Sequence, residues 1–278
     1  MAAIWIIAGI IALLLIIVIY GTAPGKMSAE AGKTAGDFCG LNCAHRGLHT
    51  KDRKTPENSL PAFAAAREHG YGVELDVRLT KDGKIVVFHD DDLGRVCGVD
   101  KPVNSLDYDE LSGLTLFDTS ERIPLFSEAL AVLGDTPLIV ELKSDRKNIA
   151  QLCENTLSIL RKYGKTWCIE SFDPNVGVWF KKHAPDVLRG QLSSIPAKLD
   201  TVSRPTAFLL GNLLTNFMSR PHFIAYSNDP HPPGVRLCML MKPVKVIWTI
   251  HPDDDIEKCE KENSVIIFEH YMPSPRFK

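Results

Sequence analysis

Two pairs of charged residues, each split by one leucine, interrupt otherwise apolar segments of the chain. Glu74 and Asp76 form the first pair, and Glu141 and Lys143 form the second. Because residues i and i+2 of a β-strand point to the same face, the members of each pair project together. Charges on apolar strands are costly to bury separately, so the pattern predicts a partner that neutralises them. Three carboxylates offer hard oxygen ligands, which suit Ca²⁺, Mg²⁺ or Mn²⁺ rather than a metal that prefers thiolates.

Two histidines stand where apolar segments with the character of strands end. His45 is followed by Arg46, and His89 is followed by Asp90. A lone histidine at a strand end, like a lone pair of acids on a strand, is usually structural, but these features occur together. Barrel enzymes carry their catalytic residues at such strand ends. Arg46 and Lys143 add positive charge, which a bound phosphate would require.

The charged motifs occur in one order along the chain: His45-Arg46-Gly47, Glu57-Asn58, Glu74-x-Asp76, His89-Asp90 and Glu141-x-Lys143. This series resembles the motifs of the glycerophosphodiester phosphodiesterase family. The resemblance covers roughly residues 40 to 270 and is strongest up to about residue 145. Five matches in the same order are much harder to obtain by chance than one, so the combination outweighs the structural interpretation of each motif.

The resemblance implies metal-dependent hydrolysis of a glycerophosphodiester to glycerol 3-phosphate and an alcohol. It assigns the acid and base to His45 and His89, the divalent cation (Ca²⁺ or Mg²⁺, with Mn²⁺ as an alternative) to Glu74, Asp76 and Glu141, and phosphate contacts to Arg46 and Lys143. Glu57, Asn58, Phe172 and Trp248 are expected to support the site. Attack by a hydroxyl of the substrate, which gives a cyclic phosphate, and direct attack by water both remain open.

The chain departs from the family pattern near its C-terminus. Phe268-Glu269 stands where Thr-Asp is more usual, and Ser59 replaces a threonine. The first difference leaves the expected metal ligands in place but affects the far wall of the pocket, and with it the preference for a headgroup or an acyl chain. A lysophospholipase D that acts on monoacyl glycerophospholipids is an alternative, which the apolar N-terminal segment and residues 207 to 218 favour, and a catalytically silent binding module is a second.

Length and composition agree with one catalytic domain, expected over residues 37 to 278. About 250 residues suit a single (β/α)₈ barrel, and apolar segments with the character of strands alternate with helical ones. Only five residues separate the strand ending at Leu79 from the one starting at Ile85, too few for a parallel crossover. The pair is therefore expected to form an antiparallel hairpin, which returns His89 to the level of Glu74, before an excursion over the barrel mouth at residues 91 to 119.

The first residues of the chain are expected to anchor it in a membrane. Residues 2 to 21 carry no charge, and their number matches the roughly 20 residues that cross a bilayer. A cleaved signal peptide is the alternative, with Ala29-Glu30-Ala31 as a cleavage site, although its apolar core would normally be shorter and follow basic residues. Lys26 and Lys33 follow the segment, which favours a cytoplasmic catalytic domain on a single-pass anchor. Residues 22 to 36 are expected to form a flexible linker.

Three further features limit the partners of the protein. The net charge of −2 and the pI near 6.5, with scattered Lys and Arg, exclude a nucleic-acid-binding surface. Seven cysteines, without a C-x-x-C pair, favour a reducing compartment. Residues 207 to 218 have the apolar spacing of one amphipathic helix, which either packs on the barrel or lies at a lipid interface. Oligomeric state is not predicted.

Overall fold

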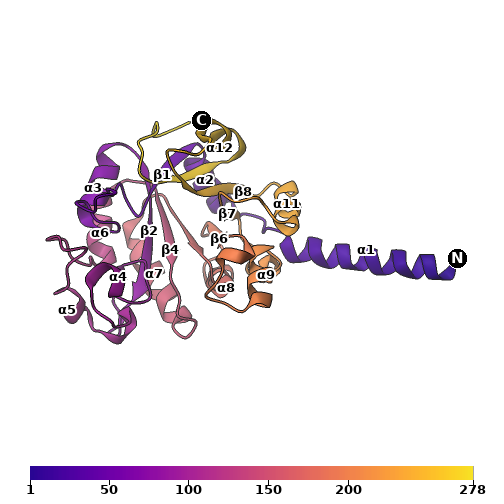
Figure 1. Cartoon of the computed structure of the whole chain (residues 1–278), viewed down its shortest axis with the longest axis horizontal. Helices are drawn as coiled ribbons and strands as arrows, with labels where there is room; N and C mark the ends of the chain where they lie inside the picture. The colour runs from indigo at the N-terminus through magenta and orange to yellow at the C-terminus, as the bar shows by residue number, and fades with distance from the viewer. Residues whose placement is uncertain (278) are drawn as a thin grey trace.

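The computed structural model describes residues 1 to 277, which form a closed barrel with one long projecting helix (Figure 1). Of the nine strands in its sheet, eight are parallel and follow chain order around the barrel; β1 closes it by pairing with both β2 and β9. The eight are β1 (Leu41–His45), β2 (Gly72–Leu79), β4 (Leu138–Leu142), β5 (Trp167–Ser171), β6 (Arg189–Ser193), β7 (Phe223–Ser227), β8 (Val244–Ile250) and β9 (Val265–Phe268). The prediction of a (β/α)₈ barrel is confirmed.

The remaining strand, β3 (Ile85–Val87), forms the predicted hairpin. It runs antiparallel to β2, with Val77 opposite Val87. The amide of Phe88 then donates a hydrogen bond of 3.0 Å to the carbonyl of Asp76, so the chain returns His89 to the level of the β2 acids. The following excursion contains the short helices α4 (Gly94–Cys97), η1 (Val103–Ser105) and α5 (Tyr108–Leu111), which pack with the hairpin in an apolar cluster of their own.

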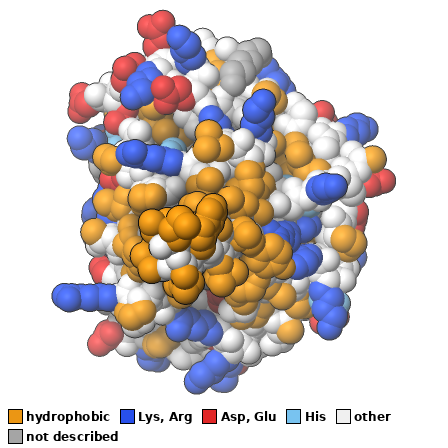
Figure 2. Space-filling view, turned by 90° about the vertical axis from the view of Figure 1, so that its right-hand side faces the viewer, with side chains coloured by type: hydrophobic (Ala, Val, Ile, Leu, Met, Phe, Trp, Pro, Cys, Tyr) orange, Lys and Arg blue, Asp and Glu red, His pale blue; other side chains and the backbone are white. Residues whose placement is uncertain are grey.

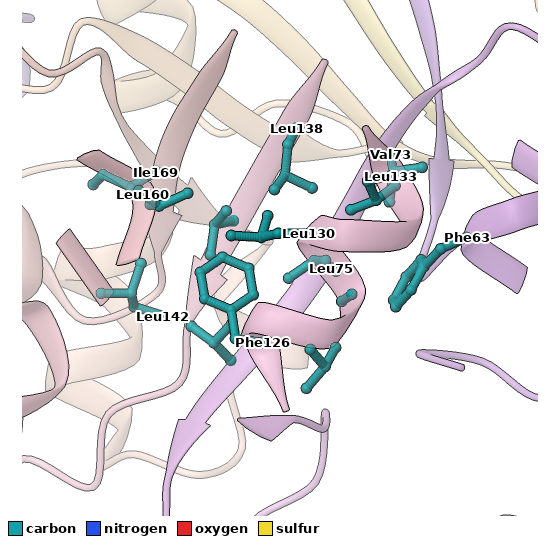
Figure 3. Packing of buried hydrophobic residues seen from close by; sticks show 14 of the residues in the cluster. Phe63, Val73, Leu75, Phe126, Leu130, Leu133, Leu138, Leu142, Leu160 and Ile169 are labelled. Atoms are coloured by element: carbon teal, nitrogen blue, oxygen red, sulfur yellow. The ribbon is translucent and has the colours of Figure 1, made fainter. Parts of the chain in front are cut away.

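The outer faces of the strands are covered by helices. The largest apolar cluster joins Val73 and Leu75 of β2 and Leu138 and Leu142 of β4 to the helices beside them (Figure 3). These helices are α3 (Leu60–Glu68), α6 (Phe126–Leu133), α7 (Ile149–Tyr163) and α8 (Pro174–His183). The other half of the barrel carries η2 (Pro196–Lys198), α9 (Arg204–Gly211), α10 (Asn216–Ser219), α11 (Pro233–Leu240) and α12 (Ile256–Glu262). Packing on both faces explains why the strands are nearly continuous apolar runs.

The interior of the barrel is filled by a second apolar cluster, and a helix closes the barrel at the amino ends of its strands. The helix α2 (Ala29–Phe38) buries Ala31, Ala35 and Phe38 in the same cluster as Leu41 and Cys43, which lie at the amino end of β1. The expectation of a flexible linker over residues 22 to 36 is therefore wrong for its second half. Spacings of four and three residues place these three side chains on one helical face, and burying that face stabilises the helix.

The N-terminal helix α1 (Ala2–Thr22) projects from the barrel (Figure 1). It is the one helix in residues 1 to 277 that is long and apolar enough to cross a membrane, and its apolar span is not buried. Only its last turn is attached. Arg220 Nη1 donates to the carbonyls of Tyr20 (3.1 Å) and Ala23 (3.0 Å), and the amide of Gly25 donates to the carbonyl of Pro221. Gly25 is required, because a Cβ there would lie 2.3 Å from the carbonyl oxygen of Arg220.

The single helix expected over residues 207 to 218 is instead two, because α9 ends at Gly211 and α10 begins at Asn216. Between them Leu213 has a left-handed backbone (φ 58°) and is fully buried in a small cluster with Ile224 and Tyr226. The left-handed residue interrupts the helix at the point where its side chain packs beside β7. Phe208, Leu209 and Phe217 remain exposed.

Candidate active site at the carboxyl ends of the strands

Three carboxylates converge inside the barrel at the carboxyl ends of β2 and β4. Asp76 and Glu141 are neighbours in the register of these strands, and Glu74 lies two residues before Asp76 on the same face. The three are only 1 to 5% exposed. One oxygen from each lies within 4.8 Å of the others. The structure therefore brings together the three residues predicted to bind a cation.

The electrostatics of this group fit a divalent cation. Burial raises the pKa of Glu74 well above its ordinary value, and the charges of Asp76 and Glu141 raise it further. Burial likewise raises the pKa of Glu141. For Asp76 burial acts in the same direction, but the charges of Lys143, His89 and Arg46 hold its pKa well below the usual range. Crowded carboxyl groups that resist ionisation without a counter-charge are suitable ligands for an oxygen-binding metal such as Ca²⁺ or Mg²⁺.

Lys143 and Arg46 place positive charge directly beside the carboxylates. Lys143 Nζ lies 2.8 Å from Glu141 Oε2 and 3.2 Å from Asp76 Oδ1. Arg46 Nη1 donates to Glu57 Oε1 (2.7 Å), and its backbone amide donates to Glu74 Oε2 (3.1 Å). Both cations thus lie within reach of a phosphate that binds at the carboxylates.

Asn58 supports the carboxylates from the loop before α3. Its Nδ2 donates to Asp76 Oδ2 at 2.8 Å, and its side chain is buried. Its backbone is left-handed (φ 55°), a conformation that asparagine tolerates better than most residues. The hydroxyl of the next residue, Ser59, accepts a bond from the amide of Ala62 and caps α3. This turn therefore fixes Asn58 against the site and starts the helix.

The two histidines reach the carboxylates from different elements. His45 Nε2, at the end of β1, lies 3.9 Å from Glu74 Oε2. Burial lowers the pKa of His45 to about 4, so its imidazole is neutral near pH 7. His89 follows the hairpin, and its Nδ1 lies 2.6 Å from Asp90 Oδ1. A neutral imidazole can accept a proton, and the Asp90 carboxylate fixes the orientation of the His89 ring.

A cavity of about 470 Å³ adjoins the site at the carboxyl ends of β5 to β8. Phe172 and Trp248, both named from the sequence, line it and meet edge to face at 5.7 Å. Lys143 Nζ lies 5.8 Å from the centre of the Phe172 ring, so the cavity borders the carboxylate group. The rest of its wall mixes Leu199 with polar residues such as Ser194 and Asn228.

Three further residues lie at the site without having been predicted to belong to it. Arg95 donates to both Asp90 and Glu57, which ties the hairpin to the loop after β1. Glu170 is buried at the register position next to Glu141, and burial raises its pKa well above the ordinary value. Glu269 Oε2 lies 3.6 Å from His45 Nδ1. A polar residue in the otherwise apolar run before Ser171 was the one available sign of Glu170.

Barrel fold and carboxylate group together define a (β/α)₈ protein with a candidate cation site at its catalytic face. The family model described as "Glycerophosphoryl diester phosphodiesterase family" matches residues 45–268, and the chain belongs to this family.

Individual curated relatives match a smaller part of the chain than the family model does. A glycerophosphodiester phosphodiesterase of Caldanaerobacter subterraneus is 32% identical over 163 residues, which are 55% of this chain and 66% of that protein. The human protein named lysophospholipase D GDPD1 is 30% identical over 141 residues, 46% of this chain and 43% of its own length. The matched part of the chain thus spans about two thirds or less of the length of these curated relatives.

Solved structures agree over a larger part of the chain. The glycerophosphodiester phosphodiesterase of Thermotoga maritima is 27% identical with a TM-score of 0.61, covering 82% of this chain and 93% of its own. A phosphodiesterase of Oleispira antarctica, solved with its product sn-glycerol-3-phosphate, has a TM-score of 0.68 at 22% identity and covers 84% of this chain and 94% of its own. The second comparison concerns the fold alone.

Proposed function

We propose that the protein hydrolyses glycerophosphodiesters to glycerol 3-phosphate and an alcohol. The observation that carries the proposal is the convergence of Glu74, Asp76 and Glu141 with Lys143 and Arg46 at the catalytic face of the barrel. Family membership supports the same reaction, as do the names of the Caldanaerobacter and Thermotoga relatives. The Oleispira structure supports a glycerol phosphate product, since that barrel holds one.

The two histidines divide the proton transfers in this proposal. His45, neutral near pH 7, accepts the proton of the attacking hydroxyl or water. His89 donates a proton to the departing alkoxide, and the Asp90 carboxylate, 2.6 Å from its Nδ1, orients the imidazole. Arg46 and Lys143 hold the phosphate, and Glu57 keeps Arg46 in place through the bond of 2.7 Å. The two histidines come from β1 and the hairpin, so they approach the phosphate from different elements.

Glu74, Asp76 and Glu141 would hold a divalent cation, with Ca²⁺ or Mg²⁺ preferred and Mn²⁺ as the alternative. When bound, such an ion neutralises negative charge on the phosphoryl oxygens. Asp76 keeps its ionised form through Lys143 and Arg46, so it is the carboxylate best prepared to bind before the others. Asn58 orients it.

The proposal is tested by assaying the purified protein on glycerophosphocholine and related diesters with Ca²⁺, Mg²⁺, Mn²⁺ or excess chelator. We expect hydrolysis with a divalent cation and none with chelator, together with a modest fall in melting temperature that Ca²⁺ or Mg²⁺ reverses. Full activity in excess chelator would remove the cation from the proposal. Failure to hydrolyse any diester under all conditions would instead favour the silent binding module.

A lysophospholipase D activity is the second candidate. The cavity of about 470 Å³ carries Phe172, Leu199 and Trp248, which an acyl chain or a large headgroup could contact. The similarity to human lysophospholipase D GDPD1 supports the same possibility. Product analysis on lysophosphatidylcholine beside glycerophosphocholine separates the two: choline released faster from the lysolipid would select this candidate, and the reverse order would reject it.

The membrane position proposed for the protein rests on α1 and the surface around it. Figure 2 looks onto the end from which α1 projects and shows hydrophobic side chains gathered around the helix, with Lys and Arg toward the edge. We define the collar as Phe208, Leu209, Phe217 and Leu240, which are 42 to 77% exposed. Tyr20 contacts Phe217 at 6.0 Å between ring centres, so the collar is continuous with α1. An apolar area next to a candidate span suits lipid.

Retention of α1 is part of the proposal. Cleavage near Ala29-Glu30-Ala31 would cut α2, whose Ala31 is fully buried, and would remove the Tyr20 and Ala23 carbonyls that Arg220 contacts. To test the collar, the double variant Phe208→Ser with Leu240→Ser is compared with wild type, both lacking residues 1 to 22. We expect the wild-type fragment to bind vesicles more tightly than the variant, and equal binding would reject the collar.

A further inference from the structure

A second group of candidate metal ligands lies at the rim of the site, apart from the three carboxylates. His49 lies in the loop after β1, while Glu269 and His270 follow β9 directly. Strands β1 and β9 are neighbours, with Ala44 opposite Phe268, so their carboxyl ends meet at one place. Residues more than two hundred positions apart in the sequence therefore lie side by side.

The distances between the three side chains suit a shared ion. His49 Nε2 lies 2.9 Å and His270 Nε2 lies 3.4 Å from the same carboxylate oxygen, Glu269 Oε1. All three ligand atoms lie within 4.8 Å of one another. Ligands held at roughly 2.0 to 2.2 Å from a tetrahedral ion are separated from each other by about 3.3 to 3.6 Å. Small side-chain adjustments would bring the three atoms onto one ion.

A buried nitrogen without a hydrogen bond provides independent support. The His49 side chain is only 8% exposed. Its Nε2 makes no hydrogen bond, and Glu269 Oε1 is an ion-pair neighbour at 2.9 Å. Buried polar atoms almost always make a hydrogen bond, so a buried nitrogen that lies beside a carboxylate without one supports an ion shared by the two groups. Two ligand atoms of one ion likewise lie close together without a hydrogen bond between them.

The donor set differs in kind from that of the first site. Glu74, Asp76 and Glu141 offer oxygen only, whereas the second group offers two imidazole nitrogens and one carboxylate. Imidazole suits Zn²⁺ and related transition metals, and two histidines with one glutamate form a known three-ligand arrangement for Zn²⁺ with one position open. The exposed His251 also lies close to the group, with its Nδ1 4.0 Å from Glu269 Oε2.

We infer that His49, Glu269 and His270 form a second cation site, selective for Zn²⁺ or a similar transition metal over Ca²⁺ and Mg²⁺. The second oxygen of Glu269 faces His45, with Oε2 3.6 Å from Nδ1. An ion bound to Oε1 would therefore hold the Glu269 carboxylate in place beside His45, the proposed base. This inference is independent of the substrate assigned above, since it concerns binding alone.

The test is a calorimetric Zn²⁺ titration of the full-length, chelator-treated protein in saturating Mg²⁺, with Co²⁺ absorption spectra as a second measurement. We expect one Zn²⁺ per chain and visible Co²⁺ bands of the intensity that four-coordinate sites give. The variant His270→Asn should weaken Zn²⁺ binding at least tenfold and reduce these bands. Asparagine suits this position because His270 has φ 61° and is exposed, so the variant is expected to fold.

Two further variants separate the sites. His69→Asn, at an exposed histidine that caps α3 and lies outside both groups, is the matched control and should bind Zn²⁺ as wild type does. Asp76→Asn removes a ligand of the first site and should leave the Zn²⁺ affinity in Mg²⁺ buffer within about twofold of the wild-type value. If Zn²⁺ bound at the first site, the affinity would fall further, because the loss of even an indirect contact to a metal typically weakens its binding 10- to 100-fold. Unchanged Zn²⁺ affinity in His270→Asn, or its loss in Asp76→Asn, would overturn the inference.

Discussion

At the scale of single residues, the site combines two histidines in contrasting surroundings. His45 is buried beside Glu74 and Glu269, whereas His89 is partly exposed and contacts Asp90. A buried, neutral imidazole can accept a proton, and an imidazole oriented by a carboxylate can transfer one. The geometry therefore supports His45 as the base and His89 as the acid.

Leaving-group dependence tests this division. General acids and bases typically contribute about 10² to 10⁴ in rate, so His45→Ala and His89→Ala should each lose that much on a diester with an alkyl leaving group. A nitrophenyl leaving group departs without a proton. The His89 variant should therefore lose much less activity on a nitrophenyl phosphodiester, while the His45 variant should lose activity on both substrates. Equal losses on the two substrates in the His89 variant would contradict the assignment.

A third histidine, outside the site, should make stability depend on pH. His222 is 1% exposed at the amino end of β7, and burial, helped by the charge of Arg189, lowers its pKa from 6.5 to about 4. As the pH falls, the unfolded chain takes up this proton at a higher pH than the folded protein does. The free energy of unfolding is therefore highest above pH 6.5 and decreases as the pH falls toward 4. Between pH 7 and pH 5, wild type should lose on the order of 1 to 2 kcal/mol more than His222→Gln.

Urea unfolding of both proteins at the two pH values measures this difference. His183→Gln, at an exposed histidine on α8, is the control and should follow wild type. Parallel losses of stability in wild type and His222→Gln would show that the buried imidazole does not titrate in this range.

At the scale of elements, α2 determines where the folded domain begins. Its Phe38 is 2% exposed and packs with residues at the amino ends of the strands. Shortening a buried phenylalanine to alanine costs about 3 to 5 kcal/mol, so Phe38→Ala should lower the free energy of unfolding by that amount. Phe208→Ala, at a phenylalanine that is 56% exposed, should stay within about 0.5 kcal/mol of wild type.

Both variants are compared by denaturant unfolding in a protein that lacks residues 1 to 22. A loss below about 1 kcal/mol for Phe38→Ala would mean that residues 29 to 38 do not close the barrel in solution. In that case residues 22 to 36 would form the flexible linker that the sequence predicts.

At the scale of the whole molecule, the candidate membrane span α1 and the site lie at different ends of the barrel. The chain leaves α1 beside Arg220 and Pro221, just before β7 begins, whereas the carboxylates lie at the carboxyl ends of β2 and β4. A membrane around α1 would therefore leave the mouth of the barrel accessible. The side of the membrane then decides which diesters the site meets.

Labelling of Cys39 tests that side. Of the seven cysteines it is the exposed one. If Lys26 and Lys33 keep the domain in the cytoplasm, a membrane-impermeant thiol reagent should label the protein in broken cells but not in intact cells. Cys39→Ser should abolish most labelling in broken cells, which identifies the reacting thiol. Labelling of wild type in intact cells would place the domain outside.

The sequence by itself determined the features that depend on neighbouring residues. The alternation of a strand aligns Glu74 with Asp76 and Glu141 with Lys143, and the five-residue gap before Ile85 allows only a hairpin, which delivered His89 to the site. The family motifs predict Arg46, Glu57 and Asn58 as further members of this group, and the structure places all three beside the carboxylates.

Tertiary structure alone decided what depends on distant segments. Glu269 meets His45 and His49 only because β9 pairs with β1 to close the barrel, and no local pattern in the sequence announces that pairing. Likewise Leu213 packs with Ile224 and Tyr226 of β7, and the apolar spacing of residues 207 to 218 does not predict the helix break at this contact. Local spacing specifies which way a side chain points, whereas packing between segments specifies what it meets, and the second cation site belongs to the latter kind.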